Sequence, residues 1–363
     1  MKIIKICLAI HSLQPGGMER VMSELAGYFC QKTGIEVHLV LYGKKPELFY
    51  KLPESIIIHK PASKFNNQLR LVSSFKRLFF IRKTVKSIGP ESLLSFGEQW
   101  NSFVLLALIG LHIPIFISDR GSPLSKSSNF HSLLKKILYL RAQGIIAQTE
   151  KAAQVYRLRF KNANIKVIGN PIRKIRGQET SVEKENIVLT VGRLIHSKHH
   201  DKLIELFISI APPEWRLVIV GDDALRQNNF ERLKSLVRDL DAEDRVILTG
   251  RQAEVDSYYL RSKLFVLTSS SEGFPNVIGE AMSAGLPVVS FDCVAGPSEM
   301  ITDGKDGYLV PLFDYKTFGD KLLTLMNDPV LREQFGKEAK SSIDRFSVER
   351  IGEQYYSFIT SSL

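Results

Sequence analysis

Two glutamates separated by seven residues, Glu272 and Glu280, flank a stretch of the chain that could bind a phosphate group. An apolar run ends shortly before Glu272, and Pro275 is a residue favoured where a helix begins. A helix start presents unpaired backbone amides and the positive end of the helix dipole, which together attract an anion. The carboxylates could accept hydrogen bonds from sugar or ribose hydroxyls. Taken alone, each glutamate is more often a solvated surface charge.

A second set of candidate residues, Arg193 and Lys198, lies in a loop between an apolar run and an expected helix. The guanidinium of Arg193 offers a fork of donors and the ammonium of Lys198 a point charge, so both could stabilise a diphosphate. As isolated residues they would be ordinary surface cations beside a turn. Our interpretation of Arg193 and Lys198 as diphosphate-binding residues therefore depends on their occurring together with the glutamate pair.

Paired glycines, Gly16 and Gly17, follow the first apolar run and precede an expected helix. Glycine lets the backbone approach a phosphate closely. The spacing is not Gly-x-Gly-x-x-Gly, so a dinucleotide site is poorly supported.

The elements that must position these residues alternate between short apolar strands and helices. In the first half we expect a helix over residues 18–30 and strands over 2–10, 35–42, 92–96, 113–118, 144–148 and 165–168. In the second half we expect helices over 199–210, 230–240, 255–261, 276–284 and 348–360, and strands over 187–191, 215–220, 246–249, 264–268 and 286–291. This alternation predicts doubly wound parallel sheets.

The chain length of 363 residues exceeds what one hydrophobic core usually serves, so we expect two domains. Residues 172–186 are polar and lack apolar periodicity, and we interpret them as the linker. Hydrophobic residues make up 44% of the chain and charged residues 24%, which excludes a disordered protein.

The net charge of +11 is concentrated in the first half. Residues 1–177 hold 28 Lys and Arg against 9 Asp and Glu, whereas residues 178–363 hold 21 against 29. A basic half could face nucleic acid, an anionic membrane or a phosphorylated substrate. Residues 75–88 and 135–141 mix basic and apolar side chains, which favours docking on an anionic membrane surface over a partly buried helix with a solvated face.

Cys7, Cys30 and Cys293 show no pairing or metal-ligand spacing, which indicates a reducing, cytoplasmic environment. The first ten residues are apolar and basic, but Pro15 and the glycines after it interrupt them before a signal peptide or membrane span is complete. The Asp-x-Asp pattern of residues 239–241 and three histidines, His196, His199 and His200, lack further metal-ligand spacing. We predict no metal site.

These elements, in this order, resemble family 4 of the glycosyltransferases, a retaining group with the GT-B fold. That fold is α/β, with two Rossmann-like doubly wound domains facing a central cleft. The glutamate pair resembles the signature of the family, and residues 167–172 (VIGNPI) resemble the segment that ends its first domain. The resemblance covers nearly the whole chain and is weaker between residues 45 and 110. It implies an acceptor-binding domain over 1–171, joined by a last helix near 346–363, and a nucleotide-sugar domain over 187–345.

The resemblance implies a role for each candidate residue. Glu272, with the amides that follow it, would hold the transferred sugar, and Glu280 the ribose. Arg193 and Lys198 would stabilise the departing diphosphate. The remaining expected donor contacts are Gly16, Gly17, Arg251, Gly273, Phe274, Pro275, Asn276 and Val277.

One position departs from the family pattern. Many members carry a histidine facing the reacting sugar where residues 117–123 stand here, and Arg120 occupies about that place. We therefore expect Arg120 to supply electrostatic stabilisation in the active site.

The implied reaction moves a hexose or N-acetylhexosamine from a UDP-sugar to a lipid-linked oligosaccharide, without a metal. Such an enzyme would work in the biosynthesis of a surface polysaccharide such as lipopolysaccharide, O-antigen or capsule. It would lie in the cytoplasm at the inner face of the membrane. Two alternatives remain: a UDP-sugar epimerase on the same architecture, and a nucleic-acid-binding protein suggested by the pI of 9.4. The acidic second half argues against nucleic acid as a partner.

Overall fold

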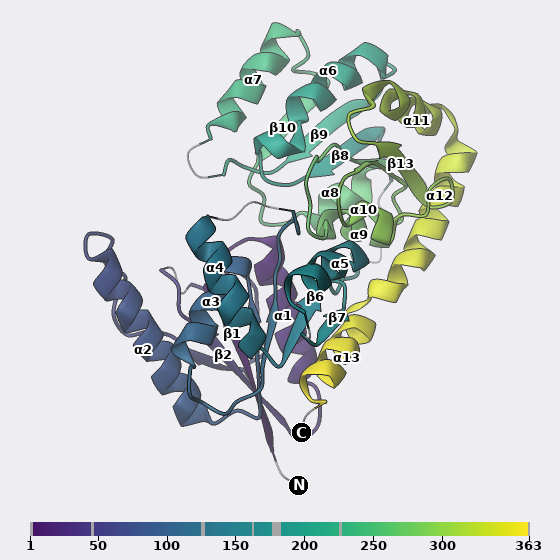
Figure 1. Ribbon diagram of the computed structural model, residues 1–363. Helices are drawn as coiled ribbons and strands as arrows, with labels where there is room; N and C mark the ends of the chain where they lie inside the picture. The colour runs from purple at the N-terminus through teal and green to yellow at the C-terminus, as the bar shows by residue number, and fades with distance from the viewer. Residues whose placement is uncertain are drawn as a thin grey trace. The chain divides into compact units, whose positions relative to one another are not determined.

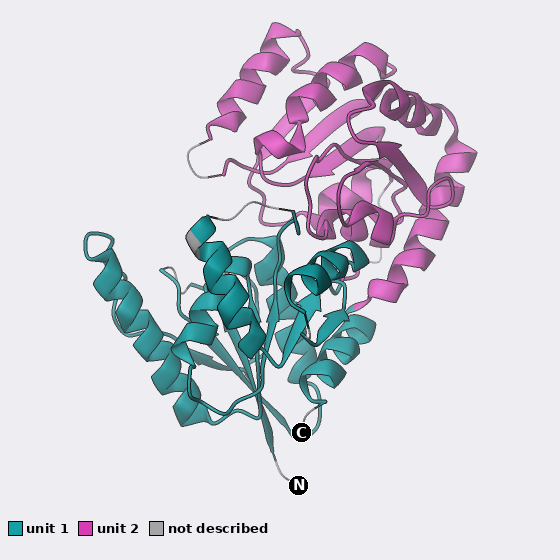
Figure 2. Cartoon of the chain, viewed as in Figure 1, with its two compact units in different colours: residues 1–171, 348–363 teal, residues 172–347 magenta. Residues whose placement is uncertain are grey.

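Both halves of the chain build a parallel sheet from short buried apolar runs (Figure 1). The computed structural model describes residues 3–44, 47–124, 128–161, 163–175, 183–224 and 227–361. The chain divides into two units, unit 1 with Met1–Pro171 and Val348–Leu363 and unit 2 with Ile172–Ser347 (Figure 2). The sheets confirm the α/β class and the doubly wound arrangement that the alternating pattern predicts.

The sheet of unit 1 has the order β3-β2-β1-β4-β5-β6-β7, and all its strand pairs are parallel. Its strands are β1 (Ile4–Ile10), β2 (Ile35–Leu41), β3 (Ile57–His59), β4 (Ser92–Phe96), β5 (Ile115–Ser118), β6 (Gly144–Ala147) and β7 (Ile165–Val167). Strands β4, β5 and β6 are buried along their whole length, as expected for a parallel sheet covered on both faces.

Helices cover both faces of this sheet. One face packs on residues from helices α2 to α5, whereas α1 and α13 pack on each other at the opposite face. The helices are α1 (Gly17–Phe29), α2 (Arg70–Ile88), α3 (Glu98–Ala107), α4 (Asn129–Leu138), α5 (Glu150–Arg159) and α13 (Val348–Ile359). Gly352 permits the close approach of α13, because a Cβ there would lie 2.5 Å from the ring of Tyr28 on α1.

The sheet of unit 2 has the order β10-β9-β8-β11-β12-β13, again fully parallel. Its strands are β8 (Ile187–Val191), β9 (Arg216–Val220), β10 (Val246–Gly250), β11 (Leu264–Leu267), β12 (Val288–Asp292) and β13 (Gly307–Pro311). Its helices are α6 (His200–Ile210), α7 (Asn229–Asp239), α8 (Asp256–Arg261), α9 (Asn276–Ser283), α10 (Pro297–Met300), α11 (Tyr315–Asn327) and α12 (Pro329–Ser342). Short 3₁₀ turns occur at η1 (Tyr139–Arg141), η2 (His196–Lys198) and η3 (Ile343–Phe346).

The strand order of each sheet reverses beside its first strand, between β1 and β4 in unit 1 and between β8 and β11 in unit 2. In open α/β sheets, ligands bind beyond the carboxyl ends of the strands at such a switch point. The loops there contain Gly16 and Gly17 in unit 1, and Lys198 and Glu272 in unit 2.

The first residue of the expected linker, Ile172, belongs to unit 2. Ile172 donates from its backbone amide to the carbonyl of Phe346 at 2.7 Å, within unit 2. Residues 176–182 of the segment lie outside the described residues. Among the residues that the structure describes, no helix has the length and apolar character needed to span a membrane.

Candidate active site

Two loops of unit 2 are joined by hydrogen bonds at the switch point. They leave the adjacent parallel strands β8 and β11 at the same edge of the sheet. The Thr268 hydroxyl donates to the carbonyl of Lys198 at 2.7 Å, and the Ser270 amide donates to that of Ser197 at 2.8 Å. These bonds hold the backbone around Lys198 beside the loop that contains Glu272.

Lys198 and Glu272 form an ion pair in this loop junction. The Nζ of Lys198 donates to Oε1 of Glu272 at 2.6 Å, with 14% and 15% of the two side chains exposed. The pair is thus partly shielded from water, where charge interactions are stronger than at an open surface. Of the four residues expected to be catalytic, these two are brought into direct contact.

The helix that follows Glu272, α9, begins at Asn276, where the sequence predicts it. Pro275 is the N-cap residue of α9 rather than its first helical residue. Gly296 packs against it with a φ of +104°, and a Cβ on Gly296 would lie 2.3 Å from Cδ of Pro275. Phe274 is buried and contacts Phe346 edge to face at 5.3 Å. Packing against the core of unit 2 therefore fixes the loop that starts α9.

Glu280 is held by side chains that the sequence does not single out. It is 6% exposed, and the hydroxyl of Tyr259 donates to its Oε2 at 3.0 Å. The Nε of Arg173 donates to Oε1 at 3.4 Å, and both terminal nitrogens of Arg173 donate to Asp256. Burial opposes the charge of Arg173, but its hydrogen bonds to Asp256 and the charge of Glu280 raise the pKa of Arg173 above the ordinary value. No sequence motif marks these partners, because they come from separate segments.

Two other predicted cations of unit 2 lie on the surface. Arg193 is exposed, and among the described residues its side chain makes no hydrogen bond or ion pair. Arg251 follows β10, is exposed, and lies 3.8 Å from a carboxylate oxygen of Asp222. Among the described residues, neither is hydrogen-bonded or ion-paired to Lys198 or Glu272.

Gly16 and Gly17 stand at the start of α1 in unit 1, as expected for the loop after the first strand. The Gly16 amide donates to the phenol oxygen of Tyr50 at 3.0 Å, and that hydroxyl donates to the Gly16 carbonyl at 2.9 Å. The guanidinium of Arg20 lies over the Tyr50 ring at 5.1 Å. The hydroxyl of Tyr50 thus accepts the hydrogen bond of the Gly16 amide, which we expect to bind phosphate. No sequence motif identifies Tyr50.

Arg120 lies after β5 among neutral groups. It donates to Asn170 at 2.6 Å, to the hydroxyl of Tyr355 at 3.2 Å and to that of Ser118 at 3.4 Å. Its guanidinium lies 4.4 Å from the centre of the Phe96 ring, and its Nε is buried without a partner. Burial lowers the pKa of Arg120. No carboxylate among the described residues is hydrogen-bonded to its guanidinium to offset this effect.

The neighbouring carboxylate, Asp119, is bound elsewhere. It accepts hydrogen bonds from Lys135 at 2.9 Å, Tyr139 at 2.6 Å and Asn101 at 3.0 Å. Lys135 is only 5% exposed, so it does not belong to the basic surface predicted for residues 135–141. The prediction was wrong for Lys135 because the local charge pattern does not show that its partner, Asp119, is buried on another element.

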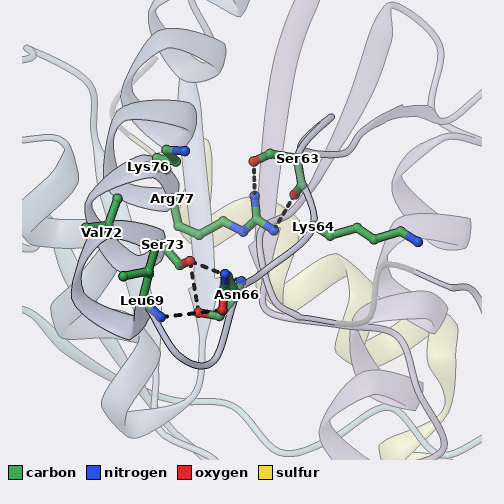
Figure 3. Close-up of a pocket in the computed structure, with 8 residues that line it drawn as sticks. All are labelled: Ser63, Lys64, Asn66, Leu69, Val72, Ser73, Lys76 and Arg77. Carbon is green, nitrogen blue, oxygen red and sulfur yellow. Dashed lines mark hydrogen bonds between the residues drawn. The ribbon is translucent and has the colours of Figure 1, made fainter.

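A similar correction applies to Arg77 in the basic stretch 75–88. Its guanidinium donates to the carbonyl of Ser63 at 2.8 Å and is buried between α2 and the preceding loop (Figure 3). The amide of Asn66 donates to the Ser73 hydroxyl at 3.1 Å beside it. A small pocket of about 110 Å³ remains here, lined by Ser63, Lys64, Asn66, Leu69, Val72, Ser73, Lys76 and Arg77.

Of the three histidines near Lys198, His199 has a hydrogen-bond partner and His200 is buried, whereas His196 is exposed. His199 and Ser270 share a hydrogen bond of 2.9 Å, and burial, with the charge of Lys198 as the next cause, lowers the pKa of His200 to about 3. Across the described part of the chain, no group of three or more His, Cys, Asp or Glu side chains is arranged to hold a metal.

Comparison with known proteins matches two family models in tandem along this chain. Residues 15–174 match the family described as Glycosyltransferase Family 4, and residues 171–342 match Glycosyl transferases group 1. This chain belongs to the family 4 glycosyltransferases. The boundary between the two matches lies where the glycosyltransferase passes from unit 1 to unit 2.

Curated relatives match the glycosyltransferase over nearly its full length. One is the Campylobacter jejuni enzyme GalNAc-α-(1→4)-GalNAc-α-(1→3)-diNAcBac-PP-undecaprenol α-1,4-N-acetyl-D-galactosaminyltransferase, 28% identical over 98% of each chain. Another is the amylovoran biosynthesis glycosyltransferase AmsD of Erwinia amylovora, 28% identical over 89% of this chain and 90% of its own. Among solved structures, HepE from Anabaena in complex with UDP-glucose matches 99% of this chain and 100% of its own, with a TM-score of 0.81 and 19% identity. That likeness confirms the GT-B fold.

Proposed function

We propose that this glycosyltransferase moves a hexose or N-acetylhexosamine, with retention, from a UDP-sugar to a lipid-linked oligosaccharide during surface-polysaccharide synthesis. The Lys198–Glu272 ion pair at the switch point of unit 2 is the observation that carries the proposal. The names of the relatives support the acceptor class, because one is named for a PP-undecaprenol acceptor and one for amylovoran biosynthesis. HepE, which has the same fold, was solved with UDP-glucose, which supports the donor class.

The chemistry demands stabilisation of negative charge on the departing nucleoside diphosphate. In the proposed complex, a phosphate oxygen takes the place of Glu272 as the partner of Lys198, and Glu272 turns to the hydroxyls of the transferred sugar. The exposed side chain of Arg193 and the start of α9 add positive potential. These groups supply the charge in place of a metal ion, so we expect turnover in the presence of a chelator.

The acceptor oxygen would attack on the face from which the diphosphate leaves, and the leaving phosphate would take the proton of the acceptor. The bond from the sugar to the phosphate breaks as the bond to the acceptor oxygen forms, so no glycosyl-enzyme accumulates. Trapping a sugar covalently on Glu272 would refute this route.

The decisive experiment measures release of UDP from a panel of UDP-sugars with a diphospho-polyprenol oligosaccharide as acceptor. Donors are first ranked by the thermal shift they cause. Release that requires both the donor and the acceptor, in the presence of EDTA, is the expected result. Interconversion of UDP-sugars without any acceptor would instead identify an epimerase, and the absence of any nucleotide-dependent shift would overturn the proposal.

Docking on an anionic membrane is the second part of the proposal, and α2 supports it. Leu71, Phe75 and Phe79 are 77%, 69% and 68% exposed on this helix, although they are large apolar side chains. The exposed cations Lys76 and Lys83 lie on the same helix. Helix α4 and the turn after it add the exposed side chains of Leu133, Ile137 and Leu140. Apolar side chains flanked by lysines are typical of surfaces that insert into an anionic interface.

A vesicle sedimentation assay tests this docking. Phe75→Ser with Phe79→Ser should reduce binding to vesicles containing anionic phospholipid by about tenfold, because two aromatic side chains that would insert into the interface are lost. Val330→Ser removes an equally exposed apolar side chain from unit 2 and should leave binding unchanged. Equal binding of all three proteins would contradict the membrane proposal.

A further inference from the structure

The segment that leaves unit 1 is bound along helix α9. The amide of Ile175 donates to the hydroxyl of Ser283 at 3.2 Å, and that hydroxyl donates to the carbonyl of Arg173 at 3.2 Å. Ile172 packs on Gly279, where a Cβ would lie 2.7 Å from its side chain. Ser283 lies three residues after Glu280 and four residues after Gly279, so the helix face that carries Ser283 adjoins both positions. Residues 172–175 therefore cover the helix face from which Glu280 projects.

The side chain of Arg173 is fixed from two directions. Its two terminal nitrogens bind the carboxylate of Asp256 as a fork, and its Nε is directed to Oε1 of Glu280 at 3.4 Å. Asp256 lies in the first turn of α8. A planar guanidinium held by a carboxylate in this way has little freedom to rotate, which a lysine ammonium would retain.

Tyr259 holds the other oxygen of Glu280. Its side chain is fully buried, and its hydroxyl donates to Oε2 at 3.0 Å. Asp256 and Tyr259 are three residues apart on α8, so one face of that helix supplies both the residue that anchors Arg173 and a direct donor to Glu280. Both carboxylate oxygens are thus oriented by protein donors before any ligand is bound.

We propose that Arg173 and Tyr259 are positioning residues that orient the Glu280 carboxylate for recognition of the donor ribose. The inference rests on the proposed function, in which Glu280 accepts hydrogen bonds from the ribose of a UDP-sugar. A carboxylate can accept about four hydrogen bonds, so two protein donors are compatible with further bonds to ribose hydroxyls. Because the Glu280 side chain is ordered before binding, the complex does not lose the entropy of ordering it. The fixed carboxylate also favours a ligand that carries the ribose hydroxyl over one that lacks it.

The test compares the affinities for UDP, 2′-deoxy-UDP and 3′-deoxy-UDP by calorimetry, in wild type and four variants. A hydrogen bond to a charged group is worth about ten- to a hundredfold in affinity, so wild type should favour UDP by at least about tenfold over one deoxy analogue. Arg173→Met and Tyr259→Phe should reduce this preference to about threefold or less. Glu280→Gln should reduce it as well, since the ribose contact itself is altered. Lys174→Met removes the neighbouring exposed charge, whose nearest acid is Asp344 at 3.6 Å, and should keep the wild-type preference.

The outcomes distinguish the ribose role of Glu280 from the positioning role of Arg173 and Tyr259. If wild type binds all three nucleotides equally, or Glu280→Gln keeps the wild-type preference, the ribose role of Glu280 fails and the inference fails with it. If Glu280→Gln loses the preference but Arg173→Met and Tyr259→Phe weaken all three nucleotides by one common factor, the two residues act only on the fold. That result overturns the positioning role and leaves the proposed function intact. Tyr259→Phe keeps the buried ring, so it remains informative if Arg173→Met does not fold.

Discussion

The cations at the two switch-point edges are neutralised in different ways. In unit 2, Lys198 and Arg173 are each bound to carboxylates, Glu272 for the first and Asp256 with Glu280 for the second. In unit 1, the guanidinium of Arg120 is surrounded by an amide, two hydroxyls and an aromatic ring. One edge holds balanced charges, and the other holds a cation whose described hydrogen-bond partners are all neutral.

This difference suggests two modes of binding. At the edge of unit 2, the proposed function requires an incoming diphosphate to replace Glu272 as the partner of Lys198. At the edge of unit 1, Arg120 carries a positive charge that burial opposes and that a nearby negative charge on a substrate would stabilise.

Removal of the exchangeable pair should have the largest effect. Lys198→Ala and Glu272→Ala should each lower kcat by about 10²- to 10³-fold, because a group that stabilises transition-state charge in a shielded site is lost. Steady-state release of UDP measures this. Lys202→Ala removes an exposed lysine that pairs with Glu205 on α6 and serves as the control. Full activity of both alanine variants would refute the site assignment.

The buried His200 beside Lys198 should make the fold sensitive to acid. Its folded pKa of about 3 lies below the unfolded value of 6.5, so the unfolded chain binds more protons between these values. The stability that neutral His200 allows is fully present above pH 6.5 and is lost progressively as pH falls toward 3. The loss amounts to about 2 kcal/mol at pH 5. Urea unfolding at pH 7.5 and pH 5 should therefore show a smaller acid loss in His200→Gln by that amount. An identical acid loss in both proteins would contradict the neutral burial of His200.

Substitution of Arg120 should have a smaller effect than loss of the ion pair. Arg120→Lys keeps the charge but loses the fork that joins Asn170 and Tyr355, and we expect kcat to fall by about tenfold. The affinity for UDP should change by less than about twofold, because the donor contacts proposed for unit 2 remain. Parallel calorimetry and rate measurements separate the two quantities. An unchanged kcat would show that the unpaired cation is structural only.

The smallest effect is expected at Tyr50. Tyr50→Phe frees the amide of Gly16 from the phenol, and one neutral hydrogen bond is worth about 1 kcal/mol. If that amide meets a donor phosphate, UDP should bind about fivefold more tightly, as calorimetry can detect. Weaker binding would instead indicate that Tyr50 supports the loop that binds the nucleotide.

Much of the fold follows from local patterns. The predicted strands at residues 35–42, 92–96 and 187–191 appear within a residue of the observed ends, because buried parallel strands are continuous apolar runs bounded by polar turns. The short strand β3 is not predicted, since only three residues of it pair at an edge of the sheet. Arg77 and Lys135 are misplaced on the surface for a different reason, since each finds its polar partner on another element.

The alternation of strands and helices and the residue types at the switch point of unit 2 can be derived from the amino-acid sequence alone. These depend on periodicity and on short motifs that are read within a few residues. Which groups meet depends on the folded chain: Lys198 meets Glu272, Tyr50 meets Gly16, and Arg173 meets Glu280. Such pairs join residues 34 to 107 positions apart in the chain. The order of strands in each sheet brings them together, and that order is a property of the whole fold rather than of any one segment.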